Sequence, residues 1–415
     1  MRISVDKHFL MDLAKKLISI PSPTESESDV MKFLEQLFVS EGFETQIQEV
    51  EPGRPQVIAT LKGTGGGRSL MFNGHLDNDS VNNRWIDIGK DPYTPEIDGN
   101  ILWGAGIHNM KSGVAAMIAA AISIKRAAIP LKGDLVIACV VGELQGGKGT
   151  LFMLESGVRT DMAIVPEPYS VSNIVTKCVG VHKCAITTIG RSIHTSRSHL
   201  AVNAVKKMDY VRLGLGEIDL PILNPDDVIK LEIPGDDPSF PDVPKINVAS
   251  VIGGRGREYD LAGPSNTPDV CTIIVDVRYS GHWEPQDIDE RFVDFLERLR
   301  ARDPDFNYEY HHPPPPRFGV GGADMPPTNV EPDMEIVNIV ERNHLKISGQ
   351  QIQKKGIILP YSYCGNDTAH LERAGIPCCL YGPRGYDEDV ELHVRIDEME
   401  TCADVLAQCA LDVCG

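Results

Sequence analysis

Short apolar strands alternate with helices in the first part of the chain, and this alternation most constrains the fold. Helical periodicity covers residues 8–42, with a break at 20–24. Beyond it, strands are predicted at 57–61, 69–73, 134–141 and 162–165, with an apolar helix at 114–127. The pattern predicts an α/β domain in which a mixed sheet is flanked by helices.

A second region of the chain has a different pattern. Residues 181–188 and 271–279 alternate as strands do, and residues 203–213 and 287–300 are helical. We therefore expect an inserted α+β domain over 178–311, with the proline-rich stretch from residue 312 as the return linker. The larger domain is then discontinuous, over 1–177 and 312–415, and a length of 415 residues suits two domains.

Composition excludes several classes of partner. A formal net charge of −19 disfavours nucleic acid and anionic membranes. The longest uncharged run, 112–124, is too short to cross a bilayer, and the polar N-terminus is unlike a secretory signal. The ten cysteines lie in apolar contexts that favour buried, reduced thiols. We expect a cytoplasmic protein that binds neither nucleic acid nor membrane.

Residues of the kind that bind metals directly follow two of the predicted strands. His75 and Asp77 come after one strand and Glu143 after another, and ligands of open α/β sheets bind at these carboxyl ends. Metal hydrolases need neutral imidazoles and carboxylates, with one position open for water. Asp77 lies two positions from His75 and can hold the tautomer of that imidazole.

Several motifs occur in a fixed order over nearly the whole chain. They are Gly-His-Leu-Asp at 74–77, the glycine-rich segments 104–113 and 142–150, Glu167-Pro168 and His393. Together they resemble the aminoacylase, acetylornithine deacetylase and carboxypeptidase G family of metal-dependent amidohydrolases, peptidase family M20. The resemblance implies a catalytic domain, an inserted lid and dimerisation domain, a homodimer or higher homo-oligomer, and hydrolysis of a C–N bond in a small molecule.

The resemblance also implies roles for the site residues, with two departures. Glu143 matches the general base, Glu167 a carboxylate ligand and His393 the distal histidine of a second metal. Asn109, however, stands where the family has a bridging Asp, and Leu144 stands where it has a ligating Glu. We therefore expect one divalent ion per subunit, Mn, Zn, Co or Fe. Asn109 either gives one neutral contact or is only structural, and His393 either joins the ion or contacts substrate.

Further residues match positions that face the substrate. His108 is a substitute ligand or a substrate contact, and Asp367 belongs to a stretch that lines the site. In the lid, His194 matches a histidine that steadies negative charge in the partner subunit's site. Asn266 and Arg278 match contacts to a substrate carboxylate, although Arg278 equally suits a strand salt bridge.

Three functions remain open from the sequence. A site with less metal charge suits hydrolytic deamination of an aromatic amine whose nitro group stabilises the negative intermediate and whose carboxylate lies ortho. The first alternative is an N-acyl-amino-acid deacylase or metallopeptidase. The second is a non-catalytic binding protein, against which the retained Glu143 argues.

Overall fold

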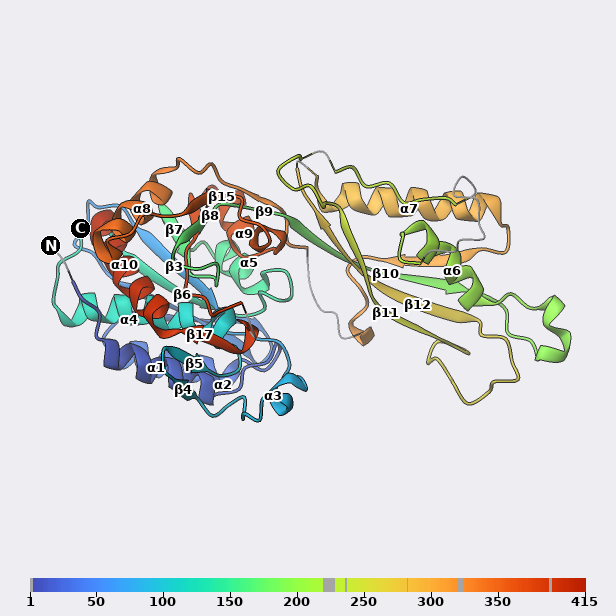
Figure 1. The fold of residues 1–415 in the computed structure, drawn as a ribbon, viewed down its shortest axis with the longest axis horizontal. Helices are drawn as coiled ribbons and strands as arrows, with labels where there is room; N and C mark the ends of the chain where they lie inside the picture. The colour runs from blue at the N-terminus through green and yellow to red at the C-terminus, as the bar shows by residue number, and fades with distance from the viewer. Residues whose placement is uncertain (1–2, 219–227, 236, 282, 319–323, 388–389) are drawn as a thin grey trace. The chain divides into compact units, whose positions relative to one another are not determined.

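The computed structural model describes residues 3–218, 228–235, 237–281, 283–318, 324–387 and 390–415. The chain divides into two compact units, each with its own hydrophobic core (Figure 1). The first unit comprises Met1–Cys178 and Thr328–Gly415, and the second comprises Val179–Pro327.

The boundary at which the chain returns to the first unit differs from the expected one. The proline-rich stretch predicts a return at residue 312, whereas the second unit extends to Pro327. The reason is backbone pairing, because Met325 and Val181 exchange both N–H···O bonds, at 2.7 and 3.1 Å. Met325 is thus still held by the second unit.

The first unit is built on a mixed sheet of eight strands in the order β1-β2-β6-β3-β7-β16-β8-β15. Its centre, β6-β3-β7-β16, is parallel, and β1, β2 and the β16–β8 pair add antiparallel pairings. The strands are β1 Glu44–Glu51, β2 Arg54–Leu61, β3 Leu70–His75, β6 Leu135–Val140, β7 Met162–Val165, β8 Asn173–Val175, β15 Lys354–Gly356 and β16 Cys378–Leu380. The expected mixed sheet flanked by helices is confirmed.

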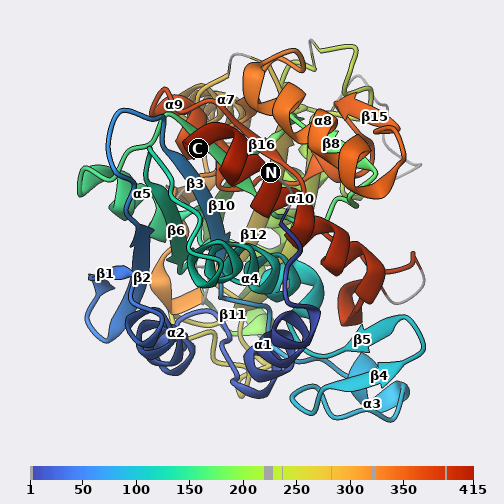
Figure 2. The same cartoon turned by 90° about the vertical axis from the view of Figure 1, so that its left-hand side faces the viewer.

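Helices cover this sheet, and α10 runs beside α4 and α8 (Figure 2). Most residues of helix α4 are buried in the core of this unit. The segment Ile107–Arg126 is long and apolar enough to cross a membrane, and its burial in this core accounts for that composition. The helices of this unit are α1 Lys7–Ser19, α2 Ser28–Ser40, α3 Arg84–Asp87, α4 Ser112–Arg126, α5 Lys148–Glu155, α8 Glu335–Ser348, α9 Thr368–Arg373 and α10 Ile396–Cys414.

Two small sheets complete the first unit. One has the order β17-β5-β4 and pairs His393 with Trp103. The other joins β9 to β14 next to the two crossings between the units. Their strands are β4 Glu96–Asp98, β5 Ile101–Trp103, β9 Lys177–Cys178, β14 Thr328–Asn329 and β17 His393–Arg395.

Among its described residues, the second unit has an antiparallel sheet in the order β11-β12-β10-β13 and the α-helices α6 and α7. Its core joins apolar residues of β10 and β12 to α6 and α7, as the alternating pattern predicts. The elements are β10 Gly180–Ile189, α6 Ala204–Gly214, β11 Lys245–Gly254, β12 Val270–Tyr279, α7 Pro285–Arg302 and β13 Asn307–His311.

Candidate metal and catalytic site

Three side chains of the candidate site come from the ends of neighbouring parallel strands. His75 is the last residue of β3, Glu143 follows β6 and Glu167 follows β7. Because β6 and β7 flank β3 in parallel, their carboxyl ends meet at one edge of the sheet. All three side chains are buried there.

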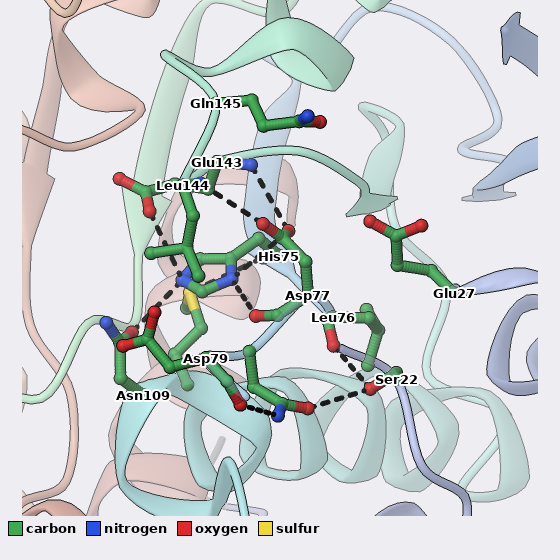
Figure 3. A network of polar contacts seen from close by, with 12 residues as sticks. Ser22, Glu27, His75, Leu76, Asp77, Asp79, Asn109, Glu143, Leu144 and Gln145 are labelled. Carbon is green, nitrogen blue, oxygen red and sulfur yellow. Dashed lines mark hydrogen bonds and ion pairs between the residues drawn. The ribbon is translucent and has the colours of Figure 1, made fainter. Parts of the chain in front are cut away.

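The His75 ring is fixed so that one nitrogen faces a group of oxygens. Its Nδ1 lies 2.8 Å from the backbone oxygen of Asp77, an acceptor only, so Nδ1 carries the proton and donates it. Nε2 then faces the amide oxygen of Asn109 at 3.0 Å (Figure 3). A carboxylate oxygen of Glu167 lies 3.4 Å from the same Nε2. Because the main chain keeps the proton on Nδ1, Nε2 offers its lone pair once a cation takes the place of a proton there.

Asp77 connects this histidine to the loop that carries Glu143. Its carboxylate accepts the backbone N–H groups of Glu143 at 3.2 Å and Leu144 at 3.1 Å, and lies 3.5 Å from His75 Nδ1 (Figure 3). Asp77 therefore positions the other groups and does not face Nε2. The Glu143 carboxylate lies 3.9 Å from His75 Nε2.

Several buried carboxyl groups surround His75, and together they make the electrostatic potential of the candidate site negative. Burial would lower the pKa of His75, but Asp77 and Glu167 raise it well above its ordinary value. Burial, reinforced by the charge of Glu167, raises the pKa of Glu143 well above its usual range and that of Asp367 to about 7. Asp367 Oδ1 is buried without a hydrogen-bond partner. A divalent cation would compensate this charge.

The residues present fit one such ion. Ligands at about 2.0–2.2 Å from one centre lie roughly 2.8–3.6 Å apart at octahedral or tetrahedral angles. The contacts of His75 Nε2 with Asn109 and Glu167 have this spacing. Leu144, where a further carboxylate is expected for a second ion, offers no ligand atom.

A second group of polar side chains surrounds His108. This residue is buried and its Nδ1 has no hydrogen-bond partner. Burial, with the charges of Arg384 and His393, lowers the pKa of His108 to about 3, so the ring is neutral. His393 Nε2 accepts the backbone N–H of Tyr386 at 3.0 Å, and its ring lies 4.7 Å from Trp103. His393 as a metal ligand stays a prediction.

Arg384 was not anticipated from the sequence. It lies in a Gly-Pro-Arg-Gly turn after β16, a context in which an arginine is ordinary. Its guanidinium stacks over Tyr361 at 4.2 Å, and its Nε is buried without a partner. The charge makes it a candidate for binding a substrate carboxylate.

The expected lid residues all belong to the second unit. His194 and Asn266 form an isolated β-bridge, and His194 Nδ1 lies 2.9 Å from Ser196 Oγ. Arg278 pairs with Asp276 through two contacts, at 2.7 and 3.1 Å. The strand salt bridge left open by the sequence is thus present, and the substrate contacts of these residues stay predictions.

Comparisons with known proteins find a family model that matches most of the chain. The model of "Peptidase family M20/M25/M40" matches residues 71–412. The chain is 26% identical over 421 residues to an N-formyl-4-amino-5-aminomethyl-2-methylpyrimidine deformylase of Halalkalibacterium halodurans, covering 96% of this chain and 91% of the relative.

Solved structures share the fold. An M20 family metallo-carboxypeptidase of Sulfolobus solfataricus is similar with a TM-score of 0.75 at 13% identity, covering 97% of this chain and 98% of that one. A dinuclear metal-binding M20 peptidase of Bacillus subtilis has a TM-score of 0.63 at 17% identity and covers 99% of both chains.

Proposed function

Because the chain belongs to the M20/M25/M40 peptidase family, we propose that its buried site hydrolyses a C–N bond in a small carboxylate-bearing substrate with one catalytic ion. The resemblance stated from the sequence motifs is confirmed, as is the assignment to metal-dependent hydrolases of C–N bonds. The number of ions and the substrate belong to the proposal.

The observation that carries the proposal is the placement of Glu143. Its buried carboxylate has a raised pKa and lies 3.9 Å from the His75 nitrogen that faces Asn109 and Glu167. A bound divalent ion would polarise the substrate and make water more acidic. Glu143 takes a proton from the attacking water and returns it to the leaving nitrogen as the C–N bond breaks.

The ligand set supports a single catalytic ion. His75 and Glu167 supply an imidazole and a carboxylate, and Asn109 adds a neutral oxygen. Such a set suits Mn, Zn, Co or Fe. His108 and His393 bind substrate or complete the coordination, and Asp367 lines the same place through its unpaired Oδ1.

Two substrate classes remain, each with its own support. The deformylase relative, which covers nearly the whole chain, favours an N-formyl or other N-acyl amine. The two lost carboxylates favour hydrolytic deamination of a nitroanthranilate, as in nitroanthranilate aminohydrolase, because the ring carries part of the developing charge. A non-catalytic binding protein is disfavoured, since binding alone has no use for the base.

The lid residues are proposed to act as the family resemblance implies. Arg278 and Asn266 would contact the substrate carboxylate, and His194 would steady negative charge in the partner subunit's site, which requires a homodimer or larger homo-oligomer. A cytoplasmic location, without nucleic-acid or membrane partners, stays a prediction.

The test is a substrate panel in which the released product identifies the bond. N-formyl amines, N-acyl amino acids, dipeptides and nitroanthranilates are offered to the native protein, to Glu143→Gln and to Glu398→Gln, a control at another buried glutamate. Formate, amino acids or ammonia distinguishes the classes.

Glu143→Gln should lose about 100- to 10,000-fold in rate and keep its metal, whereas Glu398→Gln should stay active. Near-native turnover by Glu143→Gln would remove Glu143 from the mechanism. If the metal-loaded native protein cleaves no member of the panel, the proposed substrate class is wrong.

A further inference from the structure

The second unit contains a compact cluster of two histidines and two aspartates. His182 lies on β10, His312 follows the end of β13, Asp289 lies on α7, and Asp324 directly precedes the residue that pairs with β10. All four belong to Val179–Pro327. The cluster therefore does not depend on the proposed catalytic residues.

Three ligand atoms of this cluster converge. Asp324 Oδ1 lies 3.1 Å from His182 Nδ1 and 2.8 Å from His312 Nε2. The two imidazole rings are 4.0 Å apart between centroids. The three atoms all lie within 4.8 Å of one another, close enough to share one ion after small side-chain movements.

The opposite nitrogens of both rings face a second carboxylate. Asp289 lies 2.9 Å from His312 Nδ1 and 3.4 Å from His182 Nε2, and it also accepts the hydroxyl proton of Tyr310. A histidine that binds a metal almost always donates its other ring N–H to a carboxylate, carbonyl or water. Asp289 supplies this support to His312 directly. For His182 the hydrogen-bond partner is the Tyr310 hydroxyl, which lies 3.1 Å from Nε2 and donates its own proton to Asp289.

The cluster is incompletely satisfied by its own hydrogen bonds. His182 is fully buried, yet its Nδ1 has no hydrogen-bond partner, because the nearby Asp324 oxygen lies out of hydrogen-bonding direction. Leaving such a buried nitrogen unpaired is unfavourable, because it has given up its hydrogen bonds to water. A metal ion bound to the lone pair of Nδ1 would satisfy this nitrogen. The ion could bind Asp324 as well, because it does not need the linear arrangement of a hydrogen bond.

The chemistry of the side chains also favours a cation. Asp289 and Asp324 are half-buried, and each lies within 3.4 Å of a nitrogen of both imidazole rings. Two imidazoles and a carboxylate are a ligand set for zinc.

We propose that His182 Nδ1, His312 Nε2 and Asp324 bind a divalent cation of the zinc class, with Asp289 orienting His312 directly and His182 through the Tyr310 hydroxyl. Since His312 follows β13 and Asp324 precedes Met325, the ion ties these two positions to His182 on β10. This cation is additional to the proposed catalytic ion and has a structural role in the second unit.

The experiment counts zinc in the full chain after the proposed catalytic ligands are removed. The background variant is His75→Asn with Glu167→Gln, which leaves the second unit unchanged. Asp324→Asn is then added in one protein and His311→Gln in another, the latter as a control at the neighbouring, half-buried histidine. Each protein is dialysed against buffered zinc and analysed for zinc per chain.

The background variant should retain one zinc per chain, His311→Gln should keep it, and Asp324→Asn should lose it. If the background variant binds no zinc, or if its zinc survives Asp324→Asn, the proposal is wrong. Should Asp324→Asn fail to fold, X-ray absorption of zinc in the background variant decides. A zinc coordination shell that contains two imidazoles supports the site, and a zinc coordination shell without two imidazoles overturns it.

Discussion

Asp77→Asn tests how the first unit organises its site. The Asp77 carboxylate accepts two backbone N–H groups of the Glu143 loop, whereas the proton of His75 Nδ1 is donated to the Asp77 main-chain oxygen, which the substitution keeps. The variant should therefore loosen the loop without changing the histidine tautomer.

The magnitudes follow from these contacts. An amide oxygen still accepts one of the two N–H groups, so one hydrogen bond to a charged acceptor is lost, worth about 1.5–3 kcal/mol of unfolding free energy. Losing a carboxylate that supports a metal-binding histidine costs roughly 10- to 100-fold in metal affinity. We expect about 10-fold, since the main-chain carbonyl still orients the ring.

The assays are urea unfolding of the metal-free protein and metal competition with a chelator. Asp161→Asn is the control, because Asp161 accepts the backbone N–H of Ser69 near the opposite end of β3. It should leave metal affinity unchanged. A far larger loss of metal affinity in Asp77→Asn, with native unfolding free energy, would mean that Asp77 binds the ion itself and would refute this reasoning.

Three further predictions concern other parts of the account. Leu144→Glu with Asn109→Asp should bind one more ion per chain than the native protein, and no increase at saturating metal would contradict the assignment of these positions. Burial lowers the pKa of His370 from 6.5 to about 4. The unfolded state therefore binds a proton more readily, and up to about 3 kcal/mol of unfolding free energy is lost as pH falls from 6.5 to 4. Urea unfolding of His370→Gln should show a smaller loss over this range, and an unchanged pH dependence would refute the prediction. Mixing His194→Ala with Glu143→Gln subunits should restore part of the activity if His194 acts across a dimer, whereas no recovery after verified exchange would place its action within its own subunit.

The sequence predicts the centre of the first unit well because local pattern and position coincide there. His75, Glu143 and Glu167 each follow a short apolar strand, and neighbouring parallel strands bring such residues to one edge. The spacing of His75 and Asp77 also predicts their contact. It does not reveal that the main-chain oxygen, and not the carboxylate, holds the ring proton.

Other features depend on pairings that no local pattern records. His182, Asp289 and Asp324 come from a strand, a helix and a loop, and only the tertiary fold brings them together. The return boundary was misplaced for a similar reason, since proline residues indicate a linker but do not exclude the later pairing of Met325 with Val181.

The central claim is that catalysis uses one ion, held by His75 and Glu167 with Asn109. The most direct measurement titrates metal into metal-free Asp324→Asn protein, which lacks a ligand of the proposed second-unit site, while activity and bound metal are followed together. The account predicts that activity saturates at one bound ion per chain. Activity that appears only when a second ion binds would contradict it.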